Sequence, residues 1–372
     1  MDKKRLLIFH PTVAPYRIDF FNRLNECFET RVCLFHKDLM SNKINYSLIE
    51  SQFNYTPFFL KEIIKIKKWV LYGDVLKHIK SFKPDIVIVN EFGLTTILVT
   101  IFKYLSGSHF KIISICDDNY IMAKDHEYSF TMHKIGRKVL APYIDEIILP
   151  EPKVIELYQK QYHKGFFFPI IKDEKKARDV YKRLIPQSLQ TIEKYKLSNK
   201  YVFLYVGRLV TIKNVSSIIR AFSNLNGECV LVIIGDGEEK QSLELLAKST
   251  KNRIIFTGLL EDDNLYLWYN IADCFVLASV HEPFGAVTNE ALLAGCWSLI
   301  SKRAGSSFLI KDGINGYTFD PYSINDLEEK MKRSMEQNPH HALIIDKLRC
   351  DNMTESYQYL MNCLIHHLQN EI

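Results

Sequence analysis

Two cations follow an apolar run of this sequence. The run, Tyr201–Val206, leads into Gly207-Arg208-Leu209, and Lys213 comes five residues after the arginine. Arginine can bind two phosphate oxygens at once, and lysine acts as a mobile point charge. Together they suit a diphosphate and the negative charge that develops when a nucleotide departs. Two solvated surface cations are the alternative.

Two carboxylates mark a second segment, Ser279–Ala291. Glu282 precedes a Pro-Phe-Gly turn, and Glu290 lies about one turn into the helix that we expect to begin near Val287. Carboxylate oxygens only accept hydrogen bonds, which suits the paired hydroxyls of a sugar or a ribose. The free N–H groups at the beginning of the helix add a site for phosphate. A helix-dipole role explains Glu290 alone but leaves Glu282 and the turn unexplained.

The elements that must position these residues follow one plan in both halves of the chain. Short runs rich in Val, Ile and Phe alternate with amphipathic stretches such as Tyr16–Cys27, Val70–Ser81 and Phe130–Ala141, which is typical of βα units around a parallel sheet. Ligands bind at the carboxyl ends of such strands. The predicted strands are Arg5–Phe9, Arg31–Phe35, Asp85–Asn90, Lys111–Ile115 and Glu146–Leu149, then Tyr201–Val206, Val230–Ile234, Arg253–Phe256, Cys274–Leu277, Trp297–Ile300 and Tyr317–Phe319.

The two halves are separated by a polar, Lys-rich segment with one expected helix, Lys172–Lys200. We therefore predict an α/β protein with two doubly wound domains. The first domain spans 1–170, a linker spans 171–200 and the second domain spans 201–350. The remainder, 351–372, is expected to form a helix that packs back on the first domain, because apolar residues recur there at three- and four-residue spacing.

The composition excludes several classes of protein. Of 372 residues, 47% are hydrophobic and 24% are charged, which is ordinary for a globular protein of about two domains. A formal net charge of only +5 gives no indication of a nucleic-acid partner. The eight cysteines form no Cys-x-x-Cys pair, which favours reduced thiols and a cytoplasmic location. No apolar run reaches the roughly 18 residues of a membrane span.

The second half resembles the retaining glycosyltransferases of family four. These have the GT-B architecture, in which two Rossmann-like domains face each other across a cleft. The resemblance implies that a sugar is moved from a nucleotide-sugar donor to a hydroxyl of a glycan or lipid-linked glycan, with cell-surface polysaccharide assembly as the expected setting. The matching motifs, in family order, are Gly207-Arg208-Leu209 with Lys213, Ile234–Gly237, Phe256–Gly258, Glu282-x7-Glu290 and Asp312–Phe319.

The resemblance also implies a role for each site residue. Arg208 and Lys213 would hold the donor diphosphate. Glu290 would bind the ribose hydroxyls, and Glu282 would contact the transferred sugar. Neither a metal nor another cofactor is expected, since protein cations and a helix end can stabilise the leaving group. The remaining donor-binding positions are Gly207, Gly235, Phe284, Gly285, Ala286 and Val287.

The first half departs from the family pattern in two loops. Pro11–Arg17 stands where a Gly-Gly pair is common, and Cys116–Asn119 stands where a histidine is common. Asp117 or Asp118 is expected to face the sugar in place of that histidine, with capping of the next segment as the alternative. His126 and His133, with Arg137, fall in a stretch that lines the acceptor side in relatives, but for each of them taken alone a surface position is the favoured interpretation.

Two other functions stay open. A nucleotide-sugar epimerase can have the same architecture, but the Glu282-x7-Glu290 spacing argues against it. A non-catalytic nucleotide-sugar-binding protein is the other alternative, and the complete set of charged site residues argues against that. Lys61–Trp69 interleaves lysines with isoleucine and tryptophan, which suits an anionic membrane surface, with a solvated face as the alternative. We therefore expect a cytoplasmic protein that is peripheral on the cytoplasmic membrane face.

Overall fold

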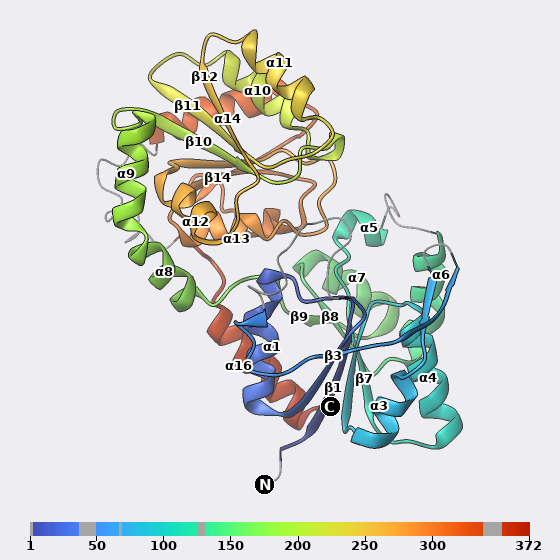
Figure 1. The fold of residues 1–372 in the computed structure, drawn as a ribbon. Coiled ribbons are helices and arrows are strands. Elements are labelled where there is room, and N and C mark those ends of the chain that lie inside the picture. The colour runs from blue at the N-terminus through green and yellow to red at the C-terminus, as the bar shows by residue number, and fades with distance from the viewer. Residues whose placement is uncertain (1–2, 37–49, 67–68, 125–130, 338–351) are drawn as a thin grey trace. The chain divides into compact units, whose positions relative to one another are not determined.

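The computed structural model describes residues 3–36, 50–66, 69–124, 131–337 and 352–372. These residues form two compact units, each of them an α/β unit built on a parallel sheet (Figure 1). One unit comprises Met1–Ile170 together with Gln358–Ile372, and the other comprises Ile171–Tyr357.

The sheet of the first unit has the strand order β3-β2-β1-β6-β7-β8-β9, and all of its paired strands are parallel. Its central strands are almost wholly apolar and buried, as expected for a sheet covered on both faces. The strands are β1 (Arg5–His10), β2 (Glu29–Leu34), β3 (Phe58–Phe59), β6 (Ile86–Asn90), β7 (Lys111–Ile115), β8 (Glu146–Leu149) and β9 (Phe166–Phe167).

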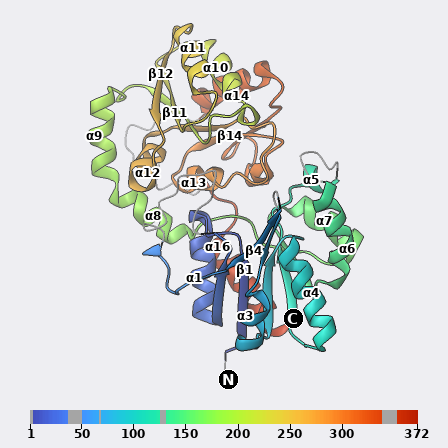
Figure 2. The same ribbon diagram turned by 45° about the vertical axis from the view of Figure 1, so that its right-hand side comes forward.

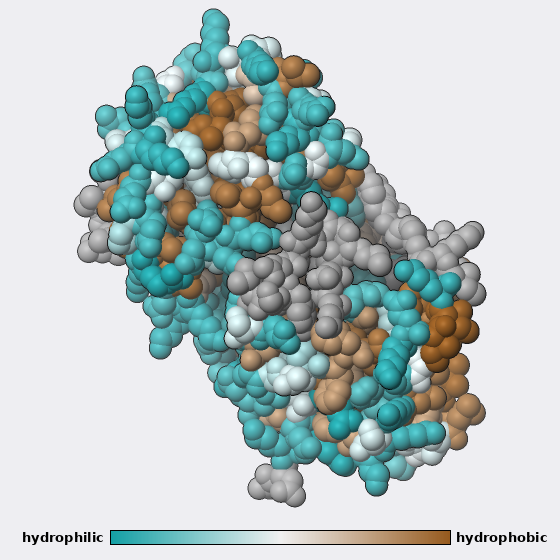
Figure 3. Space-filling view, in the orientation of Figure 1, coloured by the Kyte–Doolittle hydropathy of each residue, from teal (hydrophilic) through white to brown (hydrophobic). Residues whose placement is uncertain are grey.

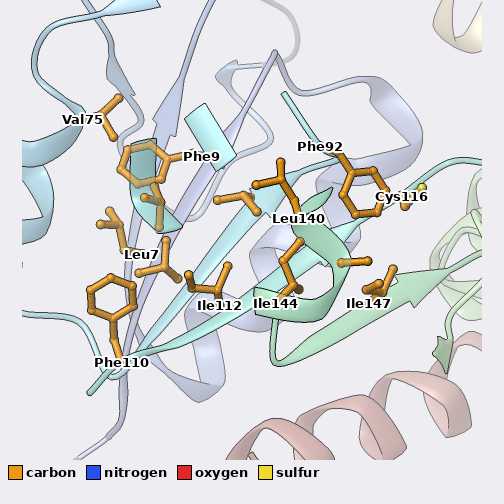
Figure 4. Close-up of a cluster of buried hydrophobic side chains, with 14 of the residues drawn as sticks. Leu7, Phe9, Val75, Phe92, Phe110, Ile112, Cys116, Leu140, Ile144 and Ile147 are labelled. Carbon is orange, nitrogen blue, oxygen red and sulfur yellow. The ribbon is translucent and has the colours of Figure 1, made fainter. Parts of the chain in front are cut away.

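Helices cover both faces of this sheet. Figures 1 and 2 show α1 and α16 on one side of it and α3 and α4 on the other. Apolar side chains from strands and helices interlock in the core, among them Phe9, Ile112 and Ile147 (Figure 4). The helices are η1 (Pro15–Arg17), α1 (Ile18–Cys27), α3 (Val75–Phe82), α4 (Leu94–Ser106), α5 (Tyr120–Lys124), α6 (Thr131–Leu140), η2 (Ala141–Tyr143), α7 (Pro152–Tyr162) and α16 (Tyr357–Asn370).

The C-terminal helix α16 belongs to the first unit by its contacts. His367 Nε2 lies 3.2 Å from Glu146 Oε2, and its ring stacks on Phe166 with 4.7 Å between the ring centroids. The Lys4 ammonium also donates to the carbonyl of Leu368 at 3.2 Å. These contacts join α16 to the residue before β1 and to strands β8 and β9 at one edge of the same sheet.

The second unit contains a six-stranded sheet in the order β12-β11-β10-β13-β14-β15, again parallel throughout. The strands are β10 (Tyr201–Val206), β11 (Cys229–Ile234), β12 (Arg253–Gly258), β13 (Cys274–Leu277), β14 (Trp297–Ser301) and β15 (Gly316–Phe319). The helices are α8 (Glu174–Arg183), α9 (Ile185–Tyr195), η3 (Thr211–Lys213), α10 (Val215–Ser223), α11 (Lys240–Lys248), α12 (Asp262–Ile271), α13 (Val287–Leu293), η4 (Gly305–Leu309) and α14 (Ile324–Gln337).

Every predicted strand forms, but two predicted helices need correction. The helix expected over Val70–Ser81 begins only at Val75, because Trp69–Tyr72 forms strand β5 and pairs antiparallel with β4 (Glu62–Ile66). Branched and aromatic side chains favour the extended conformation there. The single helix expected between the domains is in fact two, α8 and α9. Asp173 caps α8 by accepting from two backbone N–H groups, and Pro186 lies in the first turn of α9.

Candidate functional site

The loops after β10 and β11 lie against each other at the carboxyl ends of these strands. The Leu209 amide donates to the Asp236 carbonyl at 2.9 Å, and the Gly207 amide donates to the Ile234 carbonyl at 3.0 Å. A Cβ atom at Gly235 would lie only 1.9 Å from the Gly207 carbonyl oxygen. Only glycine at this position allows so close an approach, which explains the first glycine of the Gly-Asp-Gly segment.

The loop after β13 joins this group through the Val280 amide, which donates to the Ile212 carbonyl at 2.9 Å. In the same loops, the Lys213 ammonium donates to Glu282 Oε2, and Ser279 Oγ lies 3.4 Å from the same oxygen. Lys213 and Glu282 are both largely buried, with side-chain exposures of 13% and 11%. The structure thus pairs Lys213, which was predicted to hold the diphosphate, with Glu282, which was predicted to contact the sugar.

Arg208 is the exposed cation of this group. Its backbone carbonyl accepts from the Tyr205 hydroxyl at 2.9 Å, which fixes the loop while leaving the guanidinium unconstrained. Within the described part of the chain, the Arg208 guanidinium forms no ion pair. It is therefore available to an anion that reaches the loop.

The turn before α13 presents backbone N–H groups. Gly285 has φ +92°, which only glycine adopts without strain, and a Cβ there would lie 2.9 Å from Leu277 Cδ2. The turn is braced by Thr288 Oγ1, which lies 2.9 Å from Ser306 Oγ. Among the described residues, the N–H groups of Gly285, Ala286 and Val287 have no hydrogen-bond acceptor. These donors at a helix beginning can bind a phosphate or another anion.

Glu290 lies further along α13 and is nearly buried. Its Oε1 is 2.7 Å from the Lys172 ammonium, and its Oε2 accepts from the Tyr269 hydroxyl at 3.0 Å. Lys172 also donates to the Tyr266 hydroxyl at 2.6 Å. Burial by itself lowers the pKa of Lys172, but the Glu290 carboxylate and Tyr266 more than offset this, so the net pKa is raised. The Lys172 ammonium is therefore held in its charged form beside the Glu290 side chain.

Lys172, Tyr266 and Tyr269 were not among the residues predicted from the sequence. Lys172 lies at the start of the predicted linker, and the two tyrosines lie on α12. None of them belongs to a motif near Glu290 in the sequence. The cluster forms because α12 and the segment that precedes α8 both lie against α13 in the folded chain.

In the first unit, the adjacent carboxylates Asp117 and Asp118 have different surroundings. Asp117 Oδ1 accepts from Arg17 Nη2 at 2.6 Å, and the Asp117 side chain keeps 31% exposure, whereas that of Arg17 keeps 4%. Asp118 is buried, forms an ion pair with Arg137 and accepts from the Tyr158 hydroxyl at 2.8 Å. Asp117 is thus open to solvent, and Asp118 belongs to an internal network.

Two titratable groups flank these carboxylates. Burial, together with the negative charges of Asp117 and Asp118, raises the pKa of Glu91 to about 8. Burial and the Arg17 charge lower the pKa of His10 to about 4. At neutral pH, Glu91 therefore holds a proton and His10 is uncharged.

Several predicted features fall partly outside the description. His126 lies outside the described residues, and His133 lies in α6 without a described side chain. Of the Lys61–Trp69 segment, Glu62–Ile66 forms β4, and residues 67–68 lie outside the description. Across the ranges that the structure covers, no helix is long and apolar enough to cross a membrane, and no cluster of three His, Cys, Asp or Glu side chains could hold a metal ion.

The second unit is similar to a known family. Residues 189–349 match the family model described as "Glycosyl transferases group 1". An uncharacterized glycosyltransferase of Methanocaldococcus jannaschii is 35% identical over 162 residues, which is 42% of this chain and 41% of that protein. The chain spans less than half the length of the first curated relatives it matches.

Two further comparisons extend across both units. The Campylobacter jejuni protein named N-acetylgalactosamine-N,N'-diacetylbacillosaminyl-diphospho-undecaprenol 4-alpha-N-acetylgalactosaminyltransferase is 24% identical over 313 residues, 82% of each chain. The crystal structure of Anabaena HepE in complex with UDP superposes with a TM-score of 0.77 at 16% identity, covering 99% of this chain and 100% of that chain. The predicted GT-B fold, with its two Rossmann-like domains, and the resemblance to family-four glycosyltransferases are confirmed.

Proposed function

We propose that this chain, whose residues 189–349 match the family model of the glycosyl transferases of group 1, is a retaining glycosyltransferase. In this proposal it moves a sugar from a nucleotide-sugar donor to a hydroxyl of a glycan or lipid-linked glycan. The observation that carries the proposal is that three groups lie on the loops at the carboxyl ends of one sheet. They are the available Arg208 guanidinium, the Lys213–Glu282 pair and the three unpaired N–H groups of residues 285–287. The UDP complex of HepE supports a nucleotide donor.

The diphosphate is assigned to Arg208 and to the N–H groups of Gly285, Ala286 and Val287. A guanidinium matches the geometry of phosphate oxygens, and amides at a helix beginning add partial positive charge. Glu290 is assigned to the ribose. Lys172 and Tyr269 use part of its hydrogen-bonding capacity, but a carboxylate has about four lone-pair sites, so acceptor capacity remains for hydroxyls.

The transfer step needs no protein nucleophile. The bond between the anomeric carbon and the diphosphate oxygen breaks, and a bond from the acceptor oxygen forms on the same face of the sugar. The acceptor proton passes to the departing phosphate oxygen, so charge and atoms balance. Arg208 and Lys213 stabilise the developing negative charge. Glu282, oriented by Lys213, accepts from hydroxyls of the transferred sugar.

In the first unit, we assign Asp117 rather than Asp118 to the acceptor sugar. The Asp117 carboxylate is partly exposed and oriented by Arg17, whereas Asp118 is buried against Arg137 and Tyr158. Asp118 would then be structural. The Campylobacter relative, whose name describes an acceptor linked to diphospho-undecaprenol, supports a lipid-linked acceptor. We accordingly propose a role in cell-surface polysaccharide assembly, at the cytoplasmic face of the membrane and without a metal cofactor.

The test begins with thermal-shift screening of UDP-, GDP- and ADP-linked sugars. A stabilising donor is then incubated with lipid-linked saccharides, and the anomeric configuration of the product is determined by NMR, with Arg208→Ala as the matched inactive variant. Transfer with retention supports the proposal. Conversion of the donor to an isomer without any acceptor would identify an epimerase, and tight binding of the donor without any turnover would identify a binding protein. Inversion at the anomeric carbon would refute the mechanism.

A further inference from the structure

An exposed apolar face lies on α4, α6 and η2 of the first unit. Leu105 is 85% exposed, and Tyr104 packs edge-on against Tyr143 with 5.6 Å between the ring centroids, linking α4 to η2. Figure 3 shows brown surface at the position that α4 and α6 occupy in Figure 1. The exposed apolar residues of this face are Ile101, Tyr104, Leu105, Ile135, Val139 and Tyr143.

The face is separate from the surface that each helix buries in the core. On α4, Val99 is fully buried, and Phe102 packs partly buried against the core, while Ile101 and Leu105, one turn apart, point outward. On α6, Leu140 is buried, while Ile135 and Val139 are exposed. Single exposed apolar residues are ordinary, but a contiguous group on neighbouring elements indicates an interaction surface.

The charge on this face has one sign. The sequences of α4, α6 and η2 contain no aspartate or glutamate. Lys134 and Lys138 are exposed one turn apart on α6, next to the exposed Ile135 and Val139. Lys103 on α4 lies 2.8 Å from Asp145 Oδ2, so its charge is already paired. The unpaired charge of the face is therefore positive and interleaved with apolar side chains.

We propose that this face binds the surface of an anionic lipid bilayer. Apolar side chains would enter the boundary between headgroups and acyl chains, Tyr104 and Tyr143 would lie at headgroup level, and Lys134 and Lys138 would contact lipid phosphates. A protein partner would be expected to meet two lysines with acidic residues, whereas a bilayer needs only diffuse negative charge. The proposal does not depend on sugar transfer, so its test measures binding rather than activity.

This proposal places the membrane contact on helices, whereas the sequence predicted it at Lys61–Trp69, in the β4–β5 segment. β4 also exposes apolar side chains, Ile63 and Ile64, but Glu62 beside them is exposed and acidic. A negative charge there works against an anionic headgroup layer. The two surfaces can be separated by substitution, because each carries a pair of exposed lysines: Lys134 and Lys138 on α6, and Lys61 and Lys65 at β4.

The experiment is vesicle co-sedimentation of the full chain with phosphatidylcholine alone and with added phosphatidylglycerol. We expect binding that requires phosphatidylglycerol and weakens with salt. The double variants Lys134→Glu/Lys138→Glu and Leu105→Ser/Ile135→Ser should each lose about tenfold or more in affinity. Lys61→Glu/Lys65→Glu and Leu245→Ser, a change at an exposed apolar residue of the second unit, serve as matched controls that should bind like the parent. Circular dichroism confirms that every variant is folded.

Three results would overturn the proposal. Equal binding to vesicles with and without phosphatidylglycerol would show that electrostatic attraction does not contribute to binding. Loss of binding in the Lys61/Lys65 variant, with the α6 variant unaffected, would move the contact to the β4–β5 segment. The third result combines two observations: the parent does not bind vesicles and is a dimer by light scattering, and Leu105→Ser/Ile135→Ser is a monomer. It would identify the face as a contact between two copies.

Discussion

The Lys172 ammonium lies 2.7 Å from Glu290 Oε1, and the Lys172 backbone N–H donates at 2.9 Å to the side chain of Asn289, the residue before that glutamate. Two hydrogen bonds thus join the segment that enters the second unit to the helix α13. Since both charges are nearly out of water, removing either one leaves the other uncompensated. Lys172 is therefore a positioning residue for the carboxylate that we assign to the ribose.

Substitution of Lys172 should weaken nucleotide binding. For Lys172→Met, we expect a loss of about 1.5–3 kcal/mol in the affinity for UDP, the usual range for a charge-assisted hydrogen bond, measured by calorimetry. Lys172→Arg should recover part of it, because the positive charge beside Glu290 returns. Lys332→Met, which removes an exposed partner of Glu328, is the control and should leave affinity unchanged. Equal affinities for the parent and the Met variant would show that Lys172 serves stability only.

The two carboxylates of the Glu-x7-Glu motif should differ in effect. Glu290→Ala should weaken binding of the free nucleotide by about 1.5–3 kcal/mol, because two ribose hydroxyls lose their acceptor. Glu282→Gln should spare free-nucleotide affinity and lower turnover with the complete donor, because Glu282 is assigned to the sugar. Calorimetry with UDP and turnover assays with the donor separate the two effects. If both variants reduce free-nucleotide affinity equally, the division of roles is wrong.

Stabilisation of the departing diphosphate should depend on cations of the protein. Arg208→Ala should lower turnover by about 100-fold or more, comparable to removing one preorganised donor from an oxyanion site. Activity should persist in EDTA. The control is Arg220→Ala, another exposed arginine of the same unit, which should retain turnover. Complete loss of activity in EDTA that added Mn²⁺ restores, or near-normal turnover of the Arg208 variant, would contradict this account.

The strands and the motif loops could be predicted because both depend on local sequence. Runs such as Tyr201–Val206 are apolar throughout, and glycines mark the strand ends. The pairing of Lys172 with Glu290 depends on how separate elements meet, which no local pattern encodes. Asp117 and Asp118 show the same limit, because their different burial follows from Arg17, Arg137 and Tyr158, residues distant in sequence.

Because Glu91 holds a proton in the folded protein, the free energy of unfolding should fall as the pH rises. Its pKa is raised by burial from 4.5 to about 8, so between these values the folded protein holds a proton that the unfolded chain releases. Raising the pH in this window therefore favours unfolding, by on the order of 1 kcal/mol per pH unit at most. His10, with a pKa lowered to about 4, acts in the opposite direction at acid pH.

The variant Glu91→Gln isolates this contribution, because glutamine resembles the protonated acid and does not titrate. We expect the free energy of unfolding of the parent, measured by urea denaturation, to decline relative to the variant as the pH is raised from about 5 to about 8. Well below pH 4.5, where Glu91 is protonated in both the folded and the unfolded chain, the difference should be constant, and His10 contributes equally to both proteins and cancels. A difference that stays constant up to pH 8, or that grows in favour of the parent, would show that Glu91 is ionised in the folded protein.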